Sequence, residues 1–335
     1  MVHFRGQFRE TTAEPLSPWV PPPETVGRLF SSRYRIIHKI GDGATGAVFR
    51  AEDIGARESV ALKIFRPELS AEPAFVEALQ ARIRESLELS ARAAGALAPF
   101  VDVIDIGKSP EGLVFAVMPY VSGEDFATLL RRSGPVPWAQ ARGLFVRMCE
   151  TLDAYHRAGR IHGFLQSRRC LLIDGPAIRI LDTGVDRYLT GAGQGPLLDA
   201  IAPALARYAA PEQADGGALT PATDVYSLAV IFYELLTARL PFEDSSPNRM
   251  LAMHMLAEVP APRAVAPTLG IPEAVEALLL RALAKRPEER FASMAALAEA
   301  ISAISTEGAT AARVDAVQAR PATPVRRVKV HEIEG

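Results

Sequence analysis

Residues 41–48 read Gly41-Asp42-Gly43-Ala44-Thr45-Gly46-Ala47-Val48, and they join two short runs of apolar and β-branched residues. Glycines at this spacing let the backbone approach phosphate groups, because no Cβ stands in front of the N–H groups. A strand signal follows the stretch, whereas the glycine loop of a dinucleotide-binding βαβ unit opens a helix. The stretch alone is equally compatible with an ordinary hairpin.

The pattern around this stretch predicts a small antiparallel sheet followed by a helical region. Strands are expected at 35–37, 47–50, 59–64, 101–106 and 113–118. The alanine-, glutamate- and arginine-rich segment 73–96 is expected to be the one helix among them. After about residue 124 helices are expected at 138–156, 222–237, 246–257, 272–284 and 293–304.

Lys63 stands in the apolar run Val60-Ala61-Leu62-Lys63, and it is one of only five lysines in the chain. An unpaired ammonium group is costly to bury in such a strand. A phosphate and a carboxylate would balance its charge. Lys63 is therefore a candidate for binding an anion.

The glycine-rich stretch and the strand lysine together resemble the eukaryotic-like serine/threonine protein kinase family of bacteria, over roughly residues 34–304. The resemblance implies an α+β, two-lobed fold with a small antiparallel-sheet N-lobe that carries one helix and a larger helical C-lobe. It divides the chain into a proline-rich arm at 1–33, the N-lobe at 34–118, the C-lobe at 119–304 and a disordered polar tail at 305–335. Trp19 of the arm is expected to dock on the domain.

The resemblance also implies an ATP site between the lobes. The residues it assigns to the nucleotide are Gly41, Gly43, Gly46, Val48, Ala61, Lys63, Glu88, Met118, Tyr120, Val121, Arg169 and Asp182. Asp182 precedes Thr183-Gly184, where the family has its magnesium-binding Asp-Phe-Gly, and a hard carboxylate oxygen suits Mg²⁺. Asp182 is therefore the expected metal ligand.

The family pairs its strand lysine with a helix glutamate, and two ways of counting disagree about that residue here. Counting forward from Phe75 reaches Arg82, whereas counting back from 104–107 reaches Glu88. An insertion near the helix would explain the difference. Glu88 is then the first candidate to pair with Lys63, and Glu85 the second.

The segment 162–169 reads His162-Gly163-Phe164-Leu165-Gln166-Ser167-Arg168-Arg169, where the family has His-Arg-Asp-x-Lys-x-x-Asn. Phe164 falls on the aspartate that orients the attacking hydroxyl, Gln166 on the lysine and Arg169 on the asparagine that binds metal. None of the three can perform the original task. No intact catalytic residue is expected.

Gly163 replaces the arginine that would bind a phosphorylated activation segment, so Tyr188 and Thr190 are poor candidates for an activating phosphosite. The parts of the pattern that hold the large lobe together are present. Glu212 and Arg290 are placed like the family's buried ion pair, and Asp224 like the carboxylate that holds the catalytic loop.

Three functions remain open. The first is a pseudokinase that binds ATP and acts through protein partners, such as other kinases or signalling proteins, with Arg169 at the second-metal position making Mg²⁺ weakly bound or dispensable. The second is an atypical active serine/threonine kinase. The third is a nucleotide-free interaction module.

Composition excludes some partners and favours a compartment. A formal net charge of −2 and a pI near 6.3 give no overall electrostatic reason to bind nucleic acid. No apolar run reaches the roughly 18 residues of a membrane span. Two cysteines, Cys149 and Cys170, suggest no disulfide framework, so a reducing, cytoplasmic location is expected.

Overall fold

A computed structural model of the chain describes residues 19, 25–92, 100–173, 177–192 and 196–306. The expected arm and tail lie mostly outside these residues. Trp19 is described, and it packs against the apolar cluster on the outer face of the small-lobe sheet, in agreement with the expected docking.

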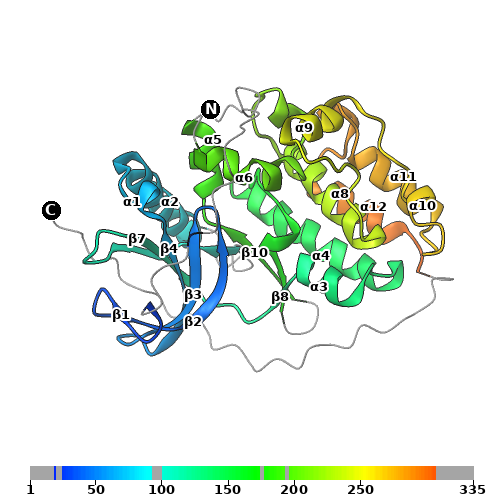
Figure 1. Cartoon of the computed structure of the whole chain (residues 1–335). Helices are drawn as coiled ribbons and strands as arrows, with labels where there is room; N and C mark the ends of the chain where they lie inside the picture. The colour runs from blue at the N-terminus through cyan, green and yellow to red at the C-terminus, as the bar shows by residue number, and fades with distance from the viewer. Residues whose placement is uncertain (1–18, 20–24, 93–99, 174–176, 193–195, 307–335) are drawn as a thin grey trace.

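The small lobe is built on a six-stranded antiparallel sheet in the order β1-β2-β3-β4-β7-β6 (Figure 1). Its strands are β1 (Leu29–Phe30), β2 (Tyr34–Gly43), β3 (Gly46–Asp53), β4 (Glu58–Phe65), β6 (Asp105–Lys108) and β7 (Val114–Pro119). Side chains alternate across the sheet, as the two-residue period of a strand requires. Val60, Leu62 and Ile64 face the outer cluster, whereas Ala61 and Phe65 face the inner one.

One predicted strand is wrong in its pairing. The run expected at 101–106 forms two strands, because its residues find partners in two sheets. β6 pairs with β7, whereas β5 (Phe100–Asp102) pairs in parallel with β10 (Ile178–Asp182). The second sheet has the order β5-β10-β9-β8, with β9 at Cys170–Leu172 and β8 at Glu124–Asp125.

Two helices cover the small lobe where one was expected. The short α1 (Pro67–Ser70) precedes α2 (Pro73–Arg92), which agrees with the start of the predicted helix. The predicted end, at residues 93–96, lies outside the described residues. Phe75 and Leu79 anchor α2 in the inner cluster.

The large lobe packs around α8 (Pro221–Thr237), most of whose residues are buried. A proline at its first position and a capping box of Thr220 with Thr223 begin this helix, as N-terminal helix signals predict. The expected helices appear as α4 (Trp138–Arg157), α9 (Pro247–Leu256), α11 (Glu273–Ala282) and α12 (Met294–Ala303). Shorter helices complete the lobe: α3 (Phe126–Ser133), α7 (Pro211–Ala214), α10 (Pro262–Val265) and the 3₁₀ turns at Ser167–Arg169 and Pro287–Glu289.

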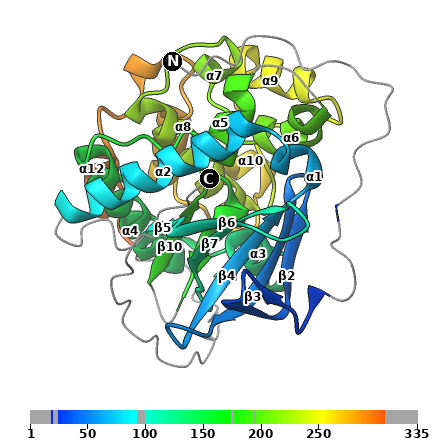
Figure 2. The same ribbon diagram turned by 90° about the vertical axis from the view of Figure 1, so that its left-hand side faces the viewer.

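Two further helices follow Asp182 and were not predicted. They are α5 (Val185–Ala192) and α6 (Pro196–Ala206). Figure 2 shows α5 beside α2, and the rings of Phe75 and Tyr188 lie 5.1 Å apart between these helices. The segment after Asp182 is therefore folded against the small-lobe helix. Within the described part of the chain, no helix is both long enough and apolar enough to cross a bilayer.

Candidate functional site

The glycine-rich stretch forms the tip of the β2–β3 hairpin, closed by the pair Gly43 and Gly46. Gly46 has a φ of 150°, and a Cβ there would lie 2.1 Å from the carbonyl oxygen of Ile64. Only glycine fits that position. A Cβ at Gly41 or Gly43 would meet nothing within 4 Å, so the folded protein itself does not require glycine at these two positions.

The apolar residues expected to hold an adenine come together on the inner face of the sheet. Val48, Ala61, Met118 and Val121 all belong to, or pack against, the inner cluster. Ala61 lies opposite Met118 across β4 and β7. Tyr120 follows Met118 along the chain and is half-buried. These residues could form one apolar wall, as the resemblance implied.

Lys63 lies opposite Val48 on the same inner face, where its side chain is half-buried. Its Nζ atom lies 5.2 Å from the centre of the Phe65 ring. No carboxylate among the described residues forms an ion pair with it. Burial, followed by the nearby positive charge of Arg169, lowers the pKa of Lys63 to about 7.

The expected pairing of Lys63 with Glu88 is not formed. Glu88 is exposed on α2, and Glu85 binds Arg82 instead, with Oε2 of Glu85 3.2 Å from Nη1 of Arg82. Helical periodicity explains this arrangement, because Phe75, Leu79 and Arg82 recur on the inward face. Arg82, which the forward count from Phe75 reaches, is therefore the inward-facing residue of the helix. It is basic, and it binds Asp182 instead of Lys63.

Arg82 binds two aspartates that the second sheet holds side by side. The parallel pairing of β5 with β10 sets Asp102 opposite Asp182. Nη2 of Arg82 donates to Oδ2 of Asp182 at 2.8 Å and to Oδ1 of Asp102 at 2.7 Å. Arg160 donates to the other oxygen of Asp102 at 3.1 Å. A guanidinium group thus lies between two carboxylates that would otherwise repel each other.

Asp182 has all of its oxygens engaged. Oδ2 also accepts a hydrogen bond from the Tyr155 hydroxyl at 2.6 Å, and Oδ1 accepts one from the Gly184 amide at 3.1 Å. Burial would by itself raise the pKa of Asp182, but Arg82 and the neighbouring cations hold that pKa below its usual value. Asp182 is therefore ionised and already neutralised by a side chain of the protein.

The loop at 162–169 is held by Asp224 from the start of α8, as predicted. Its Oδ2 accepts from the His162 amide at 2.9 Å, and its Oδ1 accepts from the Gly163 amide at 2.7 Å. The second structural prediction is also confirmed, since Arg290 and Glu212 form a buried ion pair at 2.8 Å. Both structural contacts that the sequence predicted around the loop are therefore formed.

His162 is buried in this loop as a neutral ring. Its Nδ1 accepts a hydrogen bond from the Phe164 amide at 3.2 Å, so its Nε2 carries the proton that it donates to the Leu181 carbonyl at 3.1 Å. Burial lowers the pKa of His162, which keeps the ring neutral. Both ring nitrogens form hydrogen bonds with backbone groups, so His162 has a structural role.

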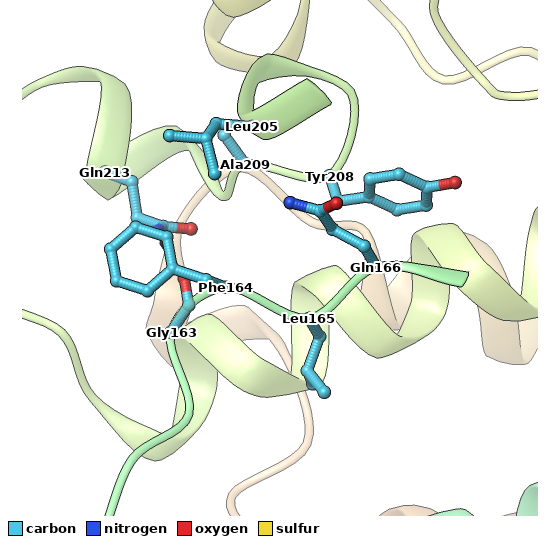
Figure 3. Close-up of a pocket in the computed structure, with 8 residues that line it drawn as sticks. All are labelled: Gly163, Phe164, Leu165, Gln166, Leu205, Tyr208, Ala209 and Gln213. Carbon is cyan, nitrogen blue, oxygen red and sulfur yellow. Dashed lines mark hydrogen bonds between the residues drawn. The ribbon is translucent and has the colours of Figure 1, made fainter. Parts of the chain in front are cut away.

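Phe164, which stands where the resemblance placed a catalytic aspartate, lines a small hollow that is partly open to solvent. The lining residues are Gly163, Phe164, Leu165, Gln166, Leu205, Tyr208, Ala209 and Gln213. Figure 3 shows the Phe164 ring and the Gln166 amide on one side of the loop and Leu165 pointing away. None of the lining residues carries a carboxylate or a cation.

Glu234 is a half-buried carboxylate that contacts Tyr208 of this hollow, and sequence reasoning missed it. It accepts hydrogen bonds from the hydroxyl groups of Ser167 and, at 2.8 Å, Tyr208. Burial raises the pKa of Glu234. Its position ten residues after Asp224, within the mostly apolar run 228–236, was the available signal. The geometry makes Glu234 an anchor for the loop and for Tyr208.

Arg169 forms an ion pair with Asp186, the second residue of α5. The positive charge of Arg169 contributes to lowering the pKa of Lys63 and the pKa of His162. Arg187 also ties α5 to the loop, through the carbonyl oxygens of Ile161 and His162 at 2.5 and 3.2 Å. Sequence reasoning did not foresee α5 as a neighbour of this site.

The donor set does not fit the Mg²⁺ ion that the family resemblance implies. Beside a nucleotide, magnesium is held by one or two carboxylates together with phosphates and waters, so each carboxylate must be accessible. Here Arg82 and Tyr155 bind Oδ2 of the one expected carboxylate, Asp182, and the Gly184 amide binds its Oδ1. Arg169 stands at the second expected ligand position. The described residues contain no group of three or more acidic, histidine or cysteine side chains suited to a metal.

The family model described as "Protein kinase domain" matches residues 34–301 of this chain. The chain belongs to the protein kinase domain family.

This kinase domain is similar to curated and solved relatives from bacteria. It is 30% identical over 290 residues to "Serine/threonine-protein kinase pkn3" of Myxococcus xanthus, covering 85% of this chain and 52% of that protein. It is 31% identical over 275 residues to "Serine/threonine-protein kinase PknH" of Mycobacterium tuberculosis, covering 82% of this chain and 42% of that protein. The chain thus spans about half the length of these relatives.

Among solved structures, the kinase domain of PknI from M. tuberculosis matches with a TM-score of 0.60 at 24% identity. The match covers 82% of this chain and 96% of that one. At this identity the likeness speaks for the fold alone. The predicted fold class, a two-lobed protein kinase fold with an antiparallel-sheet small lobe and a helical large lobe, is confirmed.

Proposed function

We propose that this kinase domain is a pseudokinase: it binds ATP between its lobes, does not transfer the γ-phosphate and acts through protein partners. The observation that carries the proposal is the hollow at Phe164. Phosphoryl transfer to a protein hydroxyl needs a carboxylate that orients the hydroxyl. The eight residues that line the hollow offer none.

The nucleotide part of the proposal is supported by the surviving small-lobe features. The hairpin leaves open space at Gly41 and Gly43, where phosphates would approach the backbone. Lys63 supplies an ammonium group that pairs with no carboxylate in the described part of the chain, and the inner face supplies an apolar wall at Val48, Ala61 and Met118. An anion with an attached aromatic ring system fits this combination.

Signalling to protein partners would follow from a shift in population. A nucleotide that binds one arrangement of the lobes more tightly than another favours the surface of that arrangement, by as much as the difference in affinity. Partners that recognise this surface, such as other kinases or signalling proteins, would then read the nucleotide state without any phosphate transfer.

The direct test is phosphate transfer from radiolabelled ATP to the protein itself and to a generic protein substrate, beside a thermal-shift titration with ATP. We expect ATP to raise the melting temperature and no label to appear in protein. Label that disappears in the Lys63→Ala and Asp182→Asn variants would refute the pseudokinase proposal. No melting shift at millimolar ATP, with or without Mg²⁺, would leave only a nucleotide-free interaction module.

A second candidate function is an atypical active serine/threonine kinase, and the names of the curated relatives favour it. Each of those reported above is called a serine/threonine-protein kinase. Positioning of the phosphoryl group supplies much of the catalysis in this class, so transfer without the aspartate would be slow rather than impossible. The same labelling experiment separates the two functions.

A further inference from the structure

The charges of the site are arranged differently from those of a site that binds a metal–nucleotide complex. Asp182 is neutralised by Arg82, which reaches it from α2 in the small lobe. The positive charge of Arg169 helps to lower the pKa of Lys63, and no carboxylate among the described residues pairs with Lys63. The cations that face the expected phosphates are thus side chains of the protein.

Resting on the nucleotide binding proposed above, we propose that this site binds the triphosphate of ATP without a divalent cation, with Lys63 and Arg169 supplying the positive charge. A free triphosphate is a strong anion, and charge-assisted hydrogen bonds from an ammonium and a guanidinium group suit its oxygens. A magnesium ion would have to enter beside the cation Arg169 and bind a carboxylate, Asp182, whose charge Arg82 already neutralises. The metal is therefore dispensable here.

Arg169 has a built-in competitor for the phosphate. In this structure Arg169 forms an ion pair with Asp186, whose carboxylate oxygen accepts from the guanidinium group as a phosphate oxygen would. Asp186 belongs to α5, which packs against α2 and is tied to the loop by Arg187. Binding of a triphosphate at Arg169 replaces this ion pair and so loosens one attachment of α5.

Isothermal titration of the full chain with ATP, in EDTA and in excess Mg²⁺, tests the inference. We expect measurable binding in EDTA, tighter than binding of adenosine, and no tightening when Mg²⁺ is added. Binding that requires Mg²⁺ overturns the metal-free site while ATP binding stands. No binding in either condition overturns the proposed function as well.

Variants at Arg169 identify the groups responsible. Arg169→Gln removes the charge and should weaken ATP binding in EDTA by about tenfold, the worth of one charge-assisted hydrogen bond. Arg169→Lys keeps the charge and should bind ATP in EDTA more tightly than Arg169→Gln. The exposed neighbour Arg168 offers the matched control, and Arg168→Gln should bind like the parent. Equal weakening by the Arg168 and Arg169 substitutions would contradict the assignment.

Asp186→Asn tests the competition from the other side. It removes the charge that occupies Arg169, so ATP affinity in EDTA should rise, again by about tenfold at most. A melting curve of each variant without ligand shows whether it folds. A folded Asp186→Asn protein with unchanged or reduced affinity would refute the competition between Asp186 and phosphate.

Discussion

Nη2 of Arg82 lies 2.8 Å from Oδ2 of Asp182, and this contact links the small-lobe helix α2 to strand β10 of the second sheet. Both side chains are almost fully buried, with 7% and 6% of their surface exposed. The pair replaces two relationships that the family resemblance implied, a lysine–glutamate pair on the small lobe and an aspartate–metal contact on the large lobe. Among the described residues Lys63 has no carboxylate partner, and Oδ2 of Asp182 is occupied by Arg82 and Tyr155.

Arg82→Ala should destabilise the protein strongly, by about 3–5 kcal/mol, because it leaves Asp182 buried without its partner. Arg84→Ala is the matched control, since Arg84 is exposed two residues along the same helix. Denaturant unfolding measures both. A loss at Arg82 no larger than the loss at Arg84 would show that the buried pair adds nothing to the fold.

Lys63 should couple nucleotide binding to proton uptake. With a pKa of about 7, Lys63 is mostly neutral at pH 8 in the free protein. A bound phosphate favours the ammonium form and raises the pKa, so Lys63 takes up a proton on binding and ATP affinity falls as pH rises above 7.

Calorimetry at pH 8 in two buffers of different ionisation enthalpy measures this uptake. Lys63→Arg keeps a positive charge throughout this range and should bind ATP without taking up a proton at this position. Equal proton uptake by the parent and by Lys63→Arg would assign the effect to another group.

The free protein should also gain stability with pH through Lys63. Its pKa is lower in the folded chain than in the unfolded chain, where it is near 10.5. Between about pH 7 and 10.5 the unfolded chain therefore binds the extra proton, and the free energy of unfolding rises with pH over this window. Lys63→Met should remove that part of the rise. Parallel pH profiles for parent and variant would argue against a lowered pKa.

Two glycines of the hairpin should separate folding from binding. Gly46→Ala forces a methyl group against the carbonyl of Ile64 at an unfavourable φ and should cost about 1–3 kcal/mol of stability. Gly43→Ala meets open space, so stability should hardly change while ATP affinity falls. Equal melting temperatures for the two variants would contradict the hairpin geometry.

Asp224→Asn should loosen the loop at 162–169. An amide can accept from only one of the two backbone N–H groups of His162 and Gly163, and an unsatisfied buried donor costs about 1–3 kcal/mol. The exposed Asp215 gives the control substitution Asp215→Asn. Thermal unfolding measures the stability of both variants. A loss of stability in Asp224→Asn no larger than that in Asp215→Asn would count against this anchoring role.

Local sequence patterns were sufficient to predict the fold and the structural contacts of the large lobe. The glycine-rich hairpin, Lys63 and the positions of Asp224, Glu212 and Arg290 follow from spacing along the chain and from the family resemblance. The losses at Phe164, Gln166 and Arg169 could be named for the same reason, because segments on both sides of the loop fix its alignment.

Arg82 shows what spacing could not decide. Two counts along the chain disagreed, and the expectation of an acidic partner for Lys63 favoured Glu88. The correct choice depended on Asp102, whose place beside Asp182 comes from a parallel strand pairing between residues about 80 positions apart. The ion pair of Arg169 with Asp186 was hidden for a similar reason, since nothing in the sequence indicated that residues after Asp182 form a helix against α2.

The parallel pairing of β5 with β10 has a consequence for how the lobes respond to their surroundings. Backbone hydrogen bonds hold Asp102 and Asp182 together, so this position always demands a cation, and Arg82 provides one that cannot diffuse away. We therefore expect the junction between α2 and the second sheet to hold together without a divalent ion.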